Sequence, residues 1–563
     1  MFRSGKFSRG RRDMVMINSS IEEMNRILRK KLSRKDYDDV CFKYGIDLTG
    51  DDGYMNFELT SDRLEIVSKY ALANLIADML GFSVHRNSTI SSKKLEVTVK
   101  KSERPFVNTL FVKLDKMIGG SIQELVEIQN KLDSTIGRNR KMAAIGIFDY
   151  DKLEFPITYS TRKKGDISFV PLGYNSEKRY DAVMLETKQG LEYGKLISGE
   201  PAVWTQKDGK IVSLPPVINA DFCSVTNETK TLFVDITGTD RHAVNSVTNA
   251  LAFNLQFFGS VEVVSPSYSS KDIDTGFSLK SEKFNLNQDN ISSILGIEIP
   301  LKKVASILKA FDYEVHEDNG DSLIIVPPFY RQDIIHQVDI VDDVVRMFGI
   351  NELPSSELRT YTVGSRLANY RAVENIRNLM IGSGYQELEL NVLTNETIQF
   401  EKTGIPSSNY APLIDIKSGD ITMTRVNVLP EMLRFVSNNL NKRFPQNLFD
   451  IGYVVRKSDA DVLFDNQLRL TIISCGKTAN VSDIVTVVRR VLSYTFTDAK
   501  PSFVKDDDLD GFSKMMIKGR AGFINYNGQN IGIVGEVHPK VLNEFGLEMP
   551  ASVAEIYLDR LGL

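Results

Sequence analysis

Residues 327–349 read PPFYRQDIIHQVDIVDDVVRMFG, and this stretch decides how the chain is interpreted. The two prolines at its start interrupt any preceding element, and the apolar spacing behind them predicts a helix that ends near Gly349. Asp339, Asp342 and Asp343 stand at i, i+3 and i+4, so on that helix they fall within one arc. Three carboxylates this close repel one another unless a cation screens their charge.

The residues alone leave two interpretations of these carboxylates open. Hard oxygen ligands suit Mg²⁺, which takes few protein ligands and keeps several waters. On this interpretation Asp333, which precedes the helix, joins Asp339, Asp342 and Asp343 as a ligand. The alternative is a solvated helix face with Asp333 as the N-cap.

Changes in periodicity and turn residues on both sides of this stretch divide the 563-residue chain into several domains. We expect a disordered basic tail over residues 1–14, a small α/β domain over 15–88 and an α+β domain over 89–268. A small α+β domain of the helix–hairpin–helix type should follow over 269–353, and a larger domain over 354–563. The predicted fold class is therefore α+β and multidomain.

Local signals predict individual elements within these domains. The sequence SSKK at 91–94 is typical of a linker, and Asn319-Gly320 predicts a hairpin turn between two strands. Apolar periodicity predicts helices over about 122–136, 242–258 and 370–382. In the last domain, three alternating stretches predict strands of a sheet, at 468–476, 519–528 and 530–539.

A second candidate site lies in the domain of residues 89–268, in the segment VDITGTD at 234–240. Asp235, Thr237 and Thr239 alternate and should share one face of a strand, with Asp240 at its end. SLPPVIN, earlier in the chain, begins with Ser213 and ends with Asn219 around two prolines that stiffen a turn. These side chains could line a polar pocket, or they could be turn caps and the solvent-facing side of a strand.

Composition excludes several classes of protein. Forty-two per cent hydrophobic and 25% charged residues are ordinary for globular domains, and a net charge of −4 gives no global field that attracts nucleic acid. Three cysteines far apart make neither a disulfide framework nor a thiolate zinc site and suit a reducing cytosol. No apolar run approaches the roughly 18 residues that a membrane helix needs. The sequence also lacks a P-loop, a GxGxxG and an HExxH motif.

Three smaller features complete the candidates. Basic clusters at 138–141 and 162–164 are either solvated loops or contacts to the phosphates of an RNA. His242 is an unsupported candidate for activating a water. Trp204, the only tryptophan, is expected in a hydrophobic core.

Several motifs in this order resemble one known family, the β subunit of phenylalanyl-tRNA synthetase of the archaeal and eukaryotic type. Residues 327–343 are similar to its PP-x-R-x-DI-x-H-x-x-DI-x-ED signature, with Asp342 where the family usually has Glu. The segments at 137–159, 213–219 and 232–240 resemble its editing domain. TRVNVLPEML, FPQNLFDIG and IGIVGEVHPKVLNEFGL resemble its C-terminal domain. The resemblance covers nearly the whole chain from about residue 16.

The resemblance implies a function and a set of partners. The domain of residues 89–268 should hydrolyse Tyr-tRNA formed by mistake, with Ser213, Asn219, Asp235 and Thr237 in its pocket. Asp333, Asp339, Asp342 and Asp343 should bind Mg²⁺. The last domain should have a class II synthetase-like antiparallel sheet with helices but no catalytic site. A catalytic α subunit in an α2β2 tetramer should bind most of the ATP and phenylalanine, and the complex should bind tRNA in the cytoplasm.

Two rival hypotheses remain. The chain could be a non-catalytic scaffold for tRNA or protein whose editing site has decayed, or it could be a free-standing deacylase. The synthetase-like last domain speaks against the second rival, because a free hydrolase has no use for it.

Overall fold

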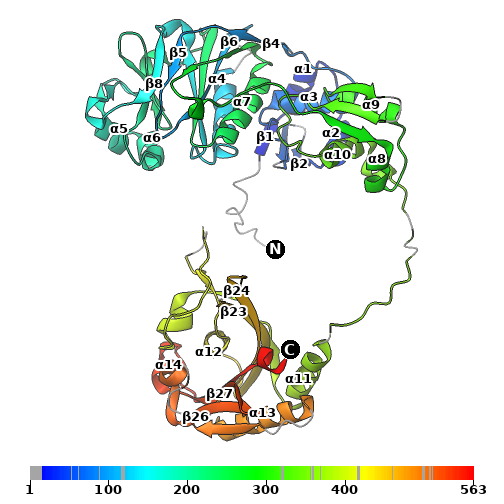
Figure 1. The fold of residues 1–563 in the computed structure, drawn as a ribbon, viewed down its shortest axis with the longest axis vertical. Helices are drawn as coiled ribbons and strands as arrows, with labels where there is room; N and C mark the ends of the chain where they lie inside the picture. The colour runs from blue at the N-terminus through cyan, green and yellow to red at the C-terminus, as the bar shows by residue number, and fades with distance from the viewer. Residues whose placement is uncertain are drawn as a thin grey trace. The chain divides into compact units, whose positions relative to one another are not determined.

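The computed structural model describes residues 15–51, 53–60, 62–87, 89–115, 121–318, 322–355, 357, 360–367, 369–414, 419–458, 461–496, 501–505, 509 and 511–563. The predicted basic tail and the Asn319-Gly320 turn lie outside these residues. The chain forms two compact units, residues 1–357 and 358–563, which are described separately (Figure 1). No helix in the described ranges combines the length and apolar character needed to cross a membrane.

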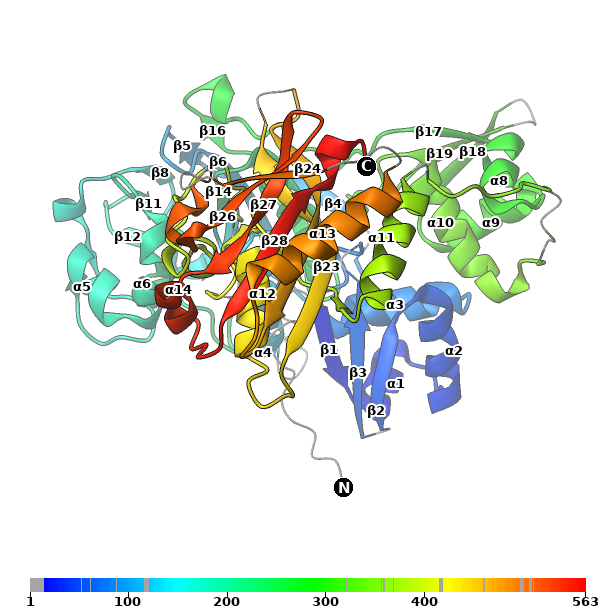
Figure 2. The same ribbon diagram turned by 90° about the horizontal axis from the view of Figure 1, so that it is seen from below.

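The first unit begins with a small α/β fold. Its antiparallel sheet has the strand order β1-β3-β2, and the strands lie side by side next to the helices (Figure 2). Met24, Tyr37 and Phe57 are fully buried in its core. In chain order the elements are β1 (Val15–Ser19), α1 (Ile21–Leu28), α2 (Arg34–Tyr44), β2 (Asp47–Asp51), β3 (Tyr54–Leu59) and α3 (Lys69–Met79).

Two sheets make up the next part of this unit. One has five strands in the order β4-β15-β6-β14-β7, and the other has six in the order β13-β12-β11-β8-β5-β16. The strands are β4 (Ile90–Lys93), β5 (Val97–Val99), β6 (Phe106–Leu114), β7 (Ala143–Asp149), β8 (Ile157–Thr161), β11 (Ala202–Thr205), β12 (Ile211–Leu214), β13 (Ile218–Asn219), β14 (Thr231–Gly238), β15 (Gly259–Val264) and β16 (Ser267–Tyr268), and a separate pair is β9 (Ser168–Phe169) and β10 (Lys178–Arg179).

The alternation of side chains along β14 explains how these sheets pack. Leu232, Val234 and Ile236 belong to a core that includes the helices α4 (Ser121–Ser134) and α7 (Arg241–Leu255). Phe233 points the other way, into a second core shared with Trp204 of the six-stranded sheet. Asp235 and Thr237 lie on the same side of the strand as Phe233. The short helices α5 (Tyr180–Glu186) and α6 (Lys188–Tyr193) complete this part.

The predicted linker at 91–94 is wrong. Residues Ile90–Lys93 form β4, which pairs in parallel with β15 at the edge of the five-stranded sheet. The pairing partner lies far along the chain, so no local pattern reveals it. The predicted helices over 122–136 and 242–258 are confirmed as α4 and α7 with slightly shorter bounds.

The last part of the first unit is a three-stranded sheet with three helices. Its strand order is β17-β19-β18, and the antiparallel pairing of β18 with β19 confirms the predicted hairpin. Its apolar residues continue the core that begins at β1 and passes through α4 and α7. The elements are β17 (Phe284–Asn287), α8 (Gln288–Leu295), α9 (Leu301–Ala310), β18 (Glu314–Asp318), β19 (Ser322–Val326) and α10 (Gln337–Phe348).

The second unit is built on a seven-stranded sheet in the order β20-β23-β24-β28-β27-β26-β25. Only the edge pair β20–β23 is parallel among the described pairs, so the predicted antiparallel sheet is confirmed in the main. The strands are β20 (Gln386–Leu388), β23 (Gln446–Lys457), β24 (Phe464–Cys475), β25 (Ser502–Lys505), β26 (Met516–Tyr526), β27 (Gln529–Val537) and β28 (Ala551–Tyr557), and a small separate pair is β21 (Leu393–Thr394) with β22 (Met423–Thr424).

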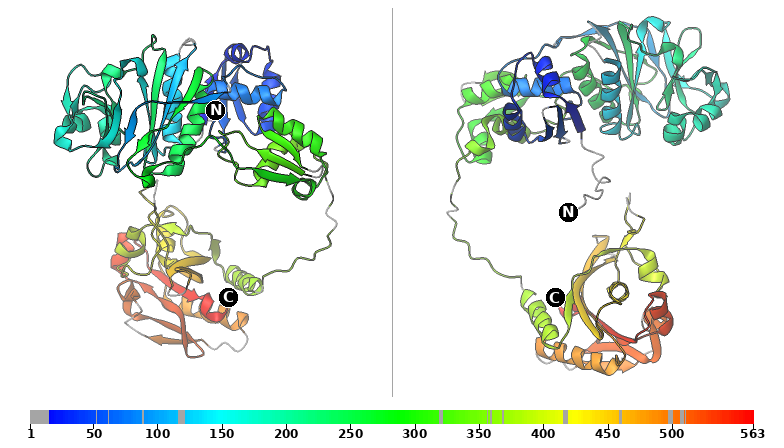
Figure 3. Two further views of the ribbon diagram at one scale, coloured as in Figure 1. Left: turned by 45° about the horizontal axis from the view of Figure 1, so that its top comes forward. Right: turned by 180° about the vertical axis from the view of Figure 1, so that it is seen from behind.

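Helices cover both faces of this sheet. One core includes α11 (Tyr370–Gly382) and α13 (Val481–Thr495), which lie next to each other across the strands in Figure 2. The other includes α12 (Leu429–Ser437) and α14 (Pro539–Glu544). Before α11, residues 360–367 form neither helix nor strand and run extended in Figure 3.

Candidate functional site

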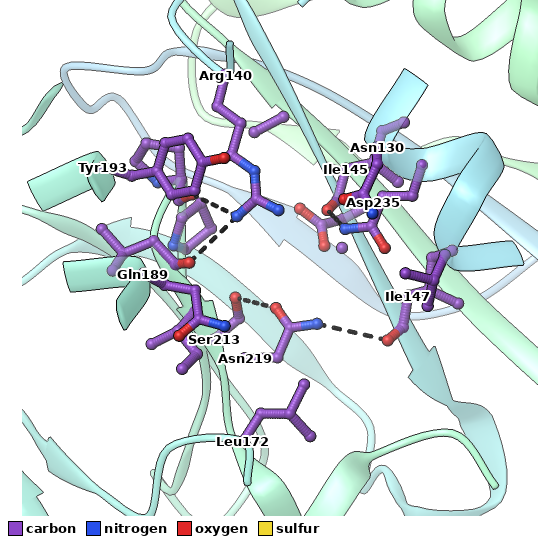
Figure 4. A pocket seen from close by; sticks show the side chains of 18 of the residues that line it. Asn130, Arg140, Ile145, Ile147, Leu172, Gln189, Tyr193, Ser213, Asn219 and Asp235 are labelled. Atoms are coloured by element: carbon purple, nitrogen blue, oxygen red, sulfur yellow. Dashed lines mark hydrogen bonds between the residues drawn. The ribbon is translucent and has the colours of Figure 1, made fainter. Parts of the chain in front are cut away.

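A cavity of about 520 Å³ opens between the two sheets of the 89–268 region, next to α4 and α6. All four predicted pocket residues, Ser213, Asn219, Asp235 and Thr237, line it. Figure 4 labels the first three of them. Apolar side chains such as Ile147 and Leu172 form much of the remaining wall. The further polar lining residues include Gln129, Asn130, Arg140, Lys188, Gln189, Glu192 and Tyr193.

Asp235 and Thr237 reach the cavity because β14 is a central strand. β6 and β7 pair with it on either side, and Asp235 lies directly opposite Gly146 of β7. A Cβ atom on Gly146 would stand 2.1 Å from Oδ1 of Asp235, so any larger residue opposite this carboxyl group would force it to move. Asp235 is only 1% exposed and Thr237 is fully buried, which rules out the solvent-facing strand as an interpretation.

Ser213 and Asn219 face each other across the turn that the two prolines form. They are cross-strand partners in β12 and β13, and the Ser213 hydroxyl donates to Oδ1 of Asn219 at 2.9 Å. The Asn219 amide nitrogen donates in turn to the carbonyl of Ile147 at 3.4 Å. These two bonds fix the orientation of the Asn219 amide at the cavity wall.

The carboxyl group of Asp235 is incompletely partnered. The indole Nε1–H of Trp204 donates to its Oδ2 at 3.1 Å, while Oδ1 has no hydrogen-bond partner. The hydroxyl of Thr237 is also buried without a partner. Burial raises the pKa of Asp235 to about 7, against the opposing effect of the Trp204 hydrogen bond. Polar atoms buried in this way are rare and mark a place where a ligand can bond.

Arg140 is a cavity residue that the sequence analysis placed in a basic surface cluster. Its guanidinium donates to Oδ2 of Asp133 at 2.9 Å and to the carbonyls of Pro216 and Val217 at 3.1 and 3.2 Å. It also lies 4.4 Å from the centre of the Tyr193 ring. Arg140 therefore ties α4, the proline turn and α6 together around the cavity.

The backbone at this arginine is unusual. Arg138, Asn139 and Arg140 all have positive φ, at 48°, 54° and 65°, which side chains other than glycine rarely adopt. The left-handed turn directs Arg140 into the cavity, and no sequence pattern predicts three such residues in succession.

Three neighbouring candidates do not reach the cavity. β14 ends at Gly238, and the Thr239 hydroxyl donates to the carbonyl of Lys141 outside it. Asp240 is the N-cap of α7 and accepts from the Ala243 amide at 2.8 Å. His242, in the first turn of α7, lies 3.4 Å from the Ser246 hydroxyl. The predicted alternation was right for Asp235 and Thr237 and wrong for Thr239.

The acidic segment is organised around a buried arginine. Arg331 donates from Nε and Nη2 to the two oxygens of Asp333 at 2.9 and 2.7 Å, and its Nη1 forms an ion pair with Asp343. The Tyr313 hydroxyl donates to the same carboxyl group of Asp343 at 2.7 Å. Burial opposes ionisation, but the Arg331 charge outweighs it and lowers the pKa of Asp343.

The other two aspartates have different partners. Asp339 accepts from the backbone amides of Ile335 and His336 at 2.9 and 2.8 Å and caps α10. Asp342 points outward, where it accepts from Nε of Arg346 at 2.7 Å.

The predicted magnesium site of Asp333, Asp339, Asp342 and Asp343 stays a prediction, because in this structure each of the four carboxylates bonds a group of the protein itself. Within the described residues, no group of three or more acidic, histidine or cysteine side chains could hold a metal ion. Asp339, Asp342 and Asp343 share a helical arc in the sequence, but Asp343 turns into the core, Asp339 turns back to the helix start and Asp342 faces out. A buried guanidinium already compensates the charge that a cation was expected to screen.

The second unit holds its buried charges in a similar way. Arg425 is 1% exposed; it pairs with Asp450 at 3.1 Å and donates to the carbonyl of Tyr453 at 2.9 Å. Glu555 is fully buried and accepts from the amides of Val428 and Leu429 at 3.0 and 3.1 Å. Arg425 is therefore a structural arginine.

Comparisons with known families match three stretches of the chain. Residues 353–558 match the phenylalanyl tRNA synthetase beta chain CLM domain, residues 284–350 the tRNA synthetase B5 domain, and residues 96–256 the B3/4 domain. The cavity lies within the B3/4 match and the acidic segment within the B5 match.

Relatives match over almost their whole length. The phenylalanine–tRNA ligase beta subunit of Pyrococcus horikoshii is 30% identical over 97% of this chain and 99% of its own. That of Thermococcus kodakarensis is 30% identical over 97% and 98%. A solved N-terminal fragment of the Pyrococcus horikoshii beta subunit superposes with a TM-score of 0.52 at 28% identity, covering 59% of this chain and 99% of the fragment. This chain therefore belongs to the family of phenylalanine–tRNA ligase beta subunits, which are components of an aminoacyl-tRNA synthetase.

Proposed function

We propose that the cavity of the B3/4 region hydrolyses tyrosyl-tRNA that the synthetase has charged by mistake. The observation that carries this proposal is the pair of buried polar atoms, Oδ1 of Asp235 and the hydroxyl of Thr237, which have no partner in a cavity that also has apolar walls. A tyrosine side chain supplies both an apolar ring for these walls and a hydroxyl for the unpartnered atoms.

The chemistry of discrimination supports a hydrolytic site for the hydroxylated amino acid. A synthetic pocket for phenylalanine cannot strongly reject an analogue that adds a hydroxyl, whereas a site built to bond that hydroxyl rejects the analogue without it. A phenylalanine residue in this cavity would leave Asp235 and Thr237 unpaired, which costs about 1–3 kcal/mol per buried group.

Hydrolysis in this cavity is expected to use an oriented water rather than a protein nucleophile. The described lining residues include no histidine or cysteine, and the Ser213 hydroxyl already donates its proton to Asn219 rather than to a base. The Asn219 amide and the Arg140 guanidinium are held at the cavity wall, where they can orient the ester and stabilise a developing oxyanion. Asp235, at the buried end, binds the amino-acid side chain.

The second unit is proposed to dock against the catalytic α subunit in an α2β2 complex. The buried charged groups near the centre of its sheet already have partners within the chain. Arg425 pairs with Asp450, and Glu555 accepts from two backbone amides. ATP, phenylalanine and the Mg²⁺ that this class of ligase uses are assigned to the partner, and tRNA to the assembled complex. We assign the complex to the cytoplasm, where the three described cysteines, all free and buried, remain reduced.

The test is the variant Asp235→Ala in the assembled synthetase. Charging of tRNA with phenylalanine should be unchanged, because the partner carries it out. Clearance of Tyr-tRNA should fall at least about tenfold, since a buried hydrogen bond to a charged group is worth about 1.5–3 kcal/mol. Thr239→Ala, in the same segment but outside the cavity, is the matched control and should clear Tyr-tRNA normally.

Unchanged clearance in Asp235→Ala removes this residue from the site. If the intact complex cannot deacylate Tyr-tRNA at all, the chain is a scaffold with a decayed editing site. Deacylation by the purified chain without its partner would favour the free-standing deacylase.

A further inference from the structure

Trp204 joins the two sheets at the buried end of the cavity. It lies on β11 of the six-stranded sheet, is 1% exposed, and donates its indole N–H to Asp235 on β14 of the five-stranded sheet. The expectation of a core tryptophan is therefore correct but incomplete. The ring is part of the core, and its one polar atom bonds the carboxyl group of the cavity.

Packing holds the indole ring in place. Its centroid lies 5.0 Å from that of Tyr159 and 6.2 Å from that of Phe233, the latter in an edge-to-face arrangement. Trp204 is also the cross-strand partner of Tyr159 on one side and Ser213 on the other. Because Tyr159, Phe233 and Ser213 surround the indole, the direction of its N–H is fixed.

The hydrogen bond makes the two oxygens of Asp235 different. Oδ2 is occupied by the indole, and Oδ1 stays free beside Gly146, where a side chain would collide with it. The torsion that exchanges the two oxygens of an aspartate is soft, so without a donor on one of them neither orientation is fixed. The indole thus leaves one unoccupied acceptor at a defined point of the cavity.

The indole N–H also acts on the charge of the carboxyl group. Burial raises the pKa of Asp235, and the Trp204 bond lowers it. Nearby Asp133 raises it and Arg104 lowers it. The other titratable groups of the surrounding elements include Arg140, Tyr159 and, from α6, Lys188, Glu192 and Tyr193. An ionised carboxylate only accepts hydrogen bonds, which suits the O–H of a phenol.

We propose that Trp204 is a positioning residue for substrate selection, which holds Asp235 as a single oriented acceptor for the tyrosine hydroxyl. This inference rests on the proposed editing function and specifies how that site distinguishes Tyr-tRNA from Phe-tRNA. Trp204 does not line the cavity and acts only through Asp235.

The experiment replaces the indole by a ring without a donor, Trp204→Phe, in the assembled synthetase. Deacylation of Tyr-tRNA and of Phe-tRNA is measured as kcat/KM across the pH range around 7. The preference for Tyr-tRNA should fall about tenfold, because one oriented hydrogen bond is worth about 1.4 kcal/mol. The pH midpoint of Tyr-tRNA deacylation should rise, since the carboxyl group loses the donor that favours its ionised form.

Two controls separate this role from a structural one. Tyr159→Phe keeps the ring that packs on Trp204 and removes only its buried hydroxyl, which donates to the carbonyl of Arg104 at 3.2 Å. This variant should change neither the preference for Tyr-tRNA nor the pH midpoint of deacylation. In an Asp235→Asn background, Trp204→Phe should have no further effect on preference, because the group it positions is altered.

The outcomes are distinct. Trp204→Phe with unchanged preference and midpoint overturns the inference while leaving editing intact, whereas absence of deacylation in the unaltered complex overturns the proposed function itself. If Trp204→Phe does not fold, the single indole ¹⁵N–¹H resonance of the unaltered full chain decides. It should shift with pH at the same midpoint as deacylation and lose this shift in Asp235→Asn; a pH-independent resonance contradicts the inference.

Discussion

Asp235 and Asp343 are both buried aspartates of the first unit, and they differ in how they are compensated. Asp343 has the Arg331 guanidinium and the Tyr313 hydroxyl as partners, and its pKa is lowered. Asp235 has one neutral indole donor, a free oxygen beside a cavity, and a pKa of about 7. A buried carboxyl group whose charge and oxygens are all partnered stabilises the fold. One that keeps an unpartnered oxygen leaves that atom available for a substrate. Perturbed carboxyl groups next to a cavity are candidates for function for this reason.

Removing the central cation of the acidic segment should have the largest effect. Arg331→Met leaves Asp333 and Asp343 without their buried partner and should lower the free energy of unfolding by about 3–5 kcal/mol. Arg346→Met is the control, because Arg346 is part-exposed and its pairs with Asp342 and Asp62 are each worth about 1 kcal/mol or less. Denaturant unfolding of the full chain measures both. Equal losses in the two variants would show that Arg331 does not organise the segment.

Replacing the incompletely compensated carboxyl group should stabilise the fold in a pH-dependent way. The folded state keeps the proton of Asp235 up to about pH 7, whereas the unfolded state loses it near the ordinary aspartate pKa of 3.8. Stability contributed by this proton is therefore present at low pH and lost as the pH rises toward 7. The side chain of Asp235→Asn does not ionise. The free energy of unfolding of this variant, relative to that of the unaltered chain, should therefore increase by about 2–3 kcal/mol between roughly pH 5 and 8.

Denaturant unfolding of both proteins at both pH values measures this difference. The contributions of the other titrating groups are the same in the two proteins and cancel. A constant difference would mean that Asp235 is ionised throughout.

Filling the space beside Asp235 should disturb the cavity more than the fold. Gly146→Ala places a Cβ 2.1 Å from Oδ1 of Asp235, and such overpacking typically costs about 1–3 kcal/mol. Tyr-tRNA deacylation should be lost because the carboxyl group must move. Gly165→Ala, where a Cβ meets nothing within 4 Å, is the control and should be neutral. Full deacylation by Gly146→Ala would separate this carboxyl group from the substrate.

Magnesium should have the smallest effect. A cation at the acidic segment would approach the buried Arg331 guanidinium. It would also compete with the two backbone amides that donate hydrogen bonds to Asp339. The unfolding midpoint of the isolated full chain should therefore be the same with magnesium or with EDTA. A bound ion at a hundred times its dissociation constant would stabilise the chain by about 2.7 kcal/mol, so a clear upward shift would support the predicted metal site instead.

Alternation and family motifs were enough to bring Ser213, Asn219, Asp235 and Thr237 into one cavity. They did not reveal Arg140, whose position depends on three left-handed residues, or Gly146, whose role appears only when β7 lies opposite β14. Helical spacing placed the acidic residues on one arc but carried no information on Arg331, which approaches them from the chain before the helix. Local sequence patterns identify neighbours along an element, and tertiary pairing determines which charges meet.

The hydrophobic core of the first unit runs without interruption from β1 through α4 and α7 to α10. The boundaries at 88 and 268 stay predictions, and because the core is shared we expect that cutting the chain there would not give independently stable pieces. By contrast, Tyr361 and Val363, before α11, are almost completely exposed. A protease should accordingly cleave the native chain first within residues 360–367, and the amino-terminal fragment should melt in a single cooperative transition.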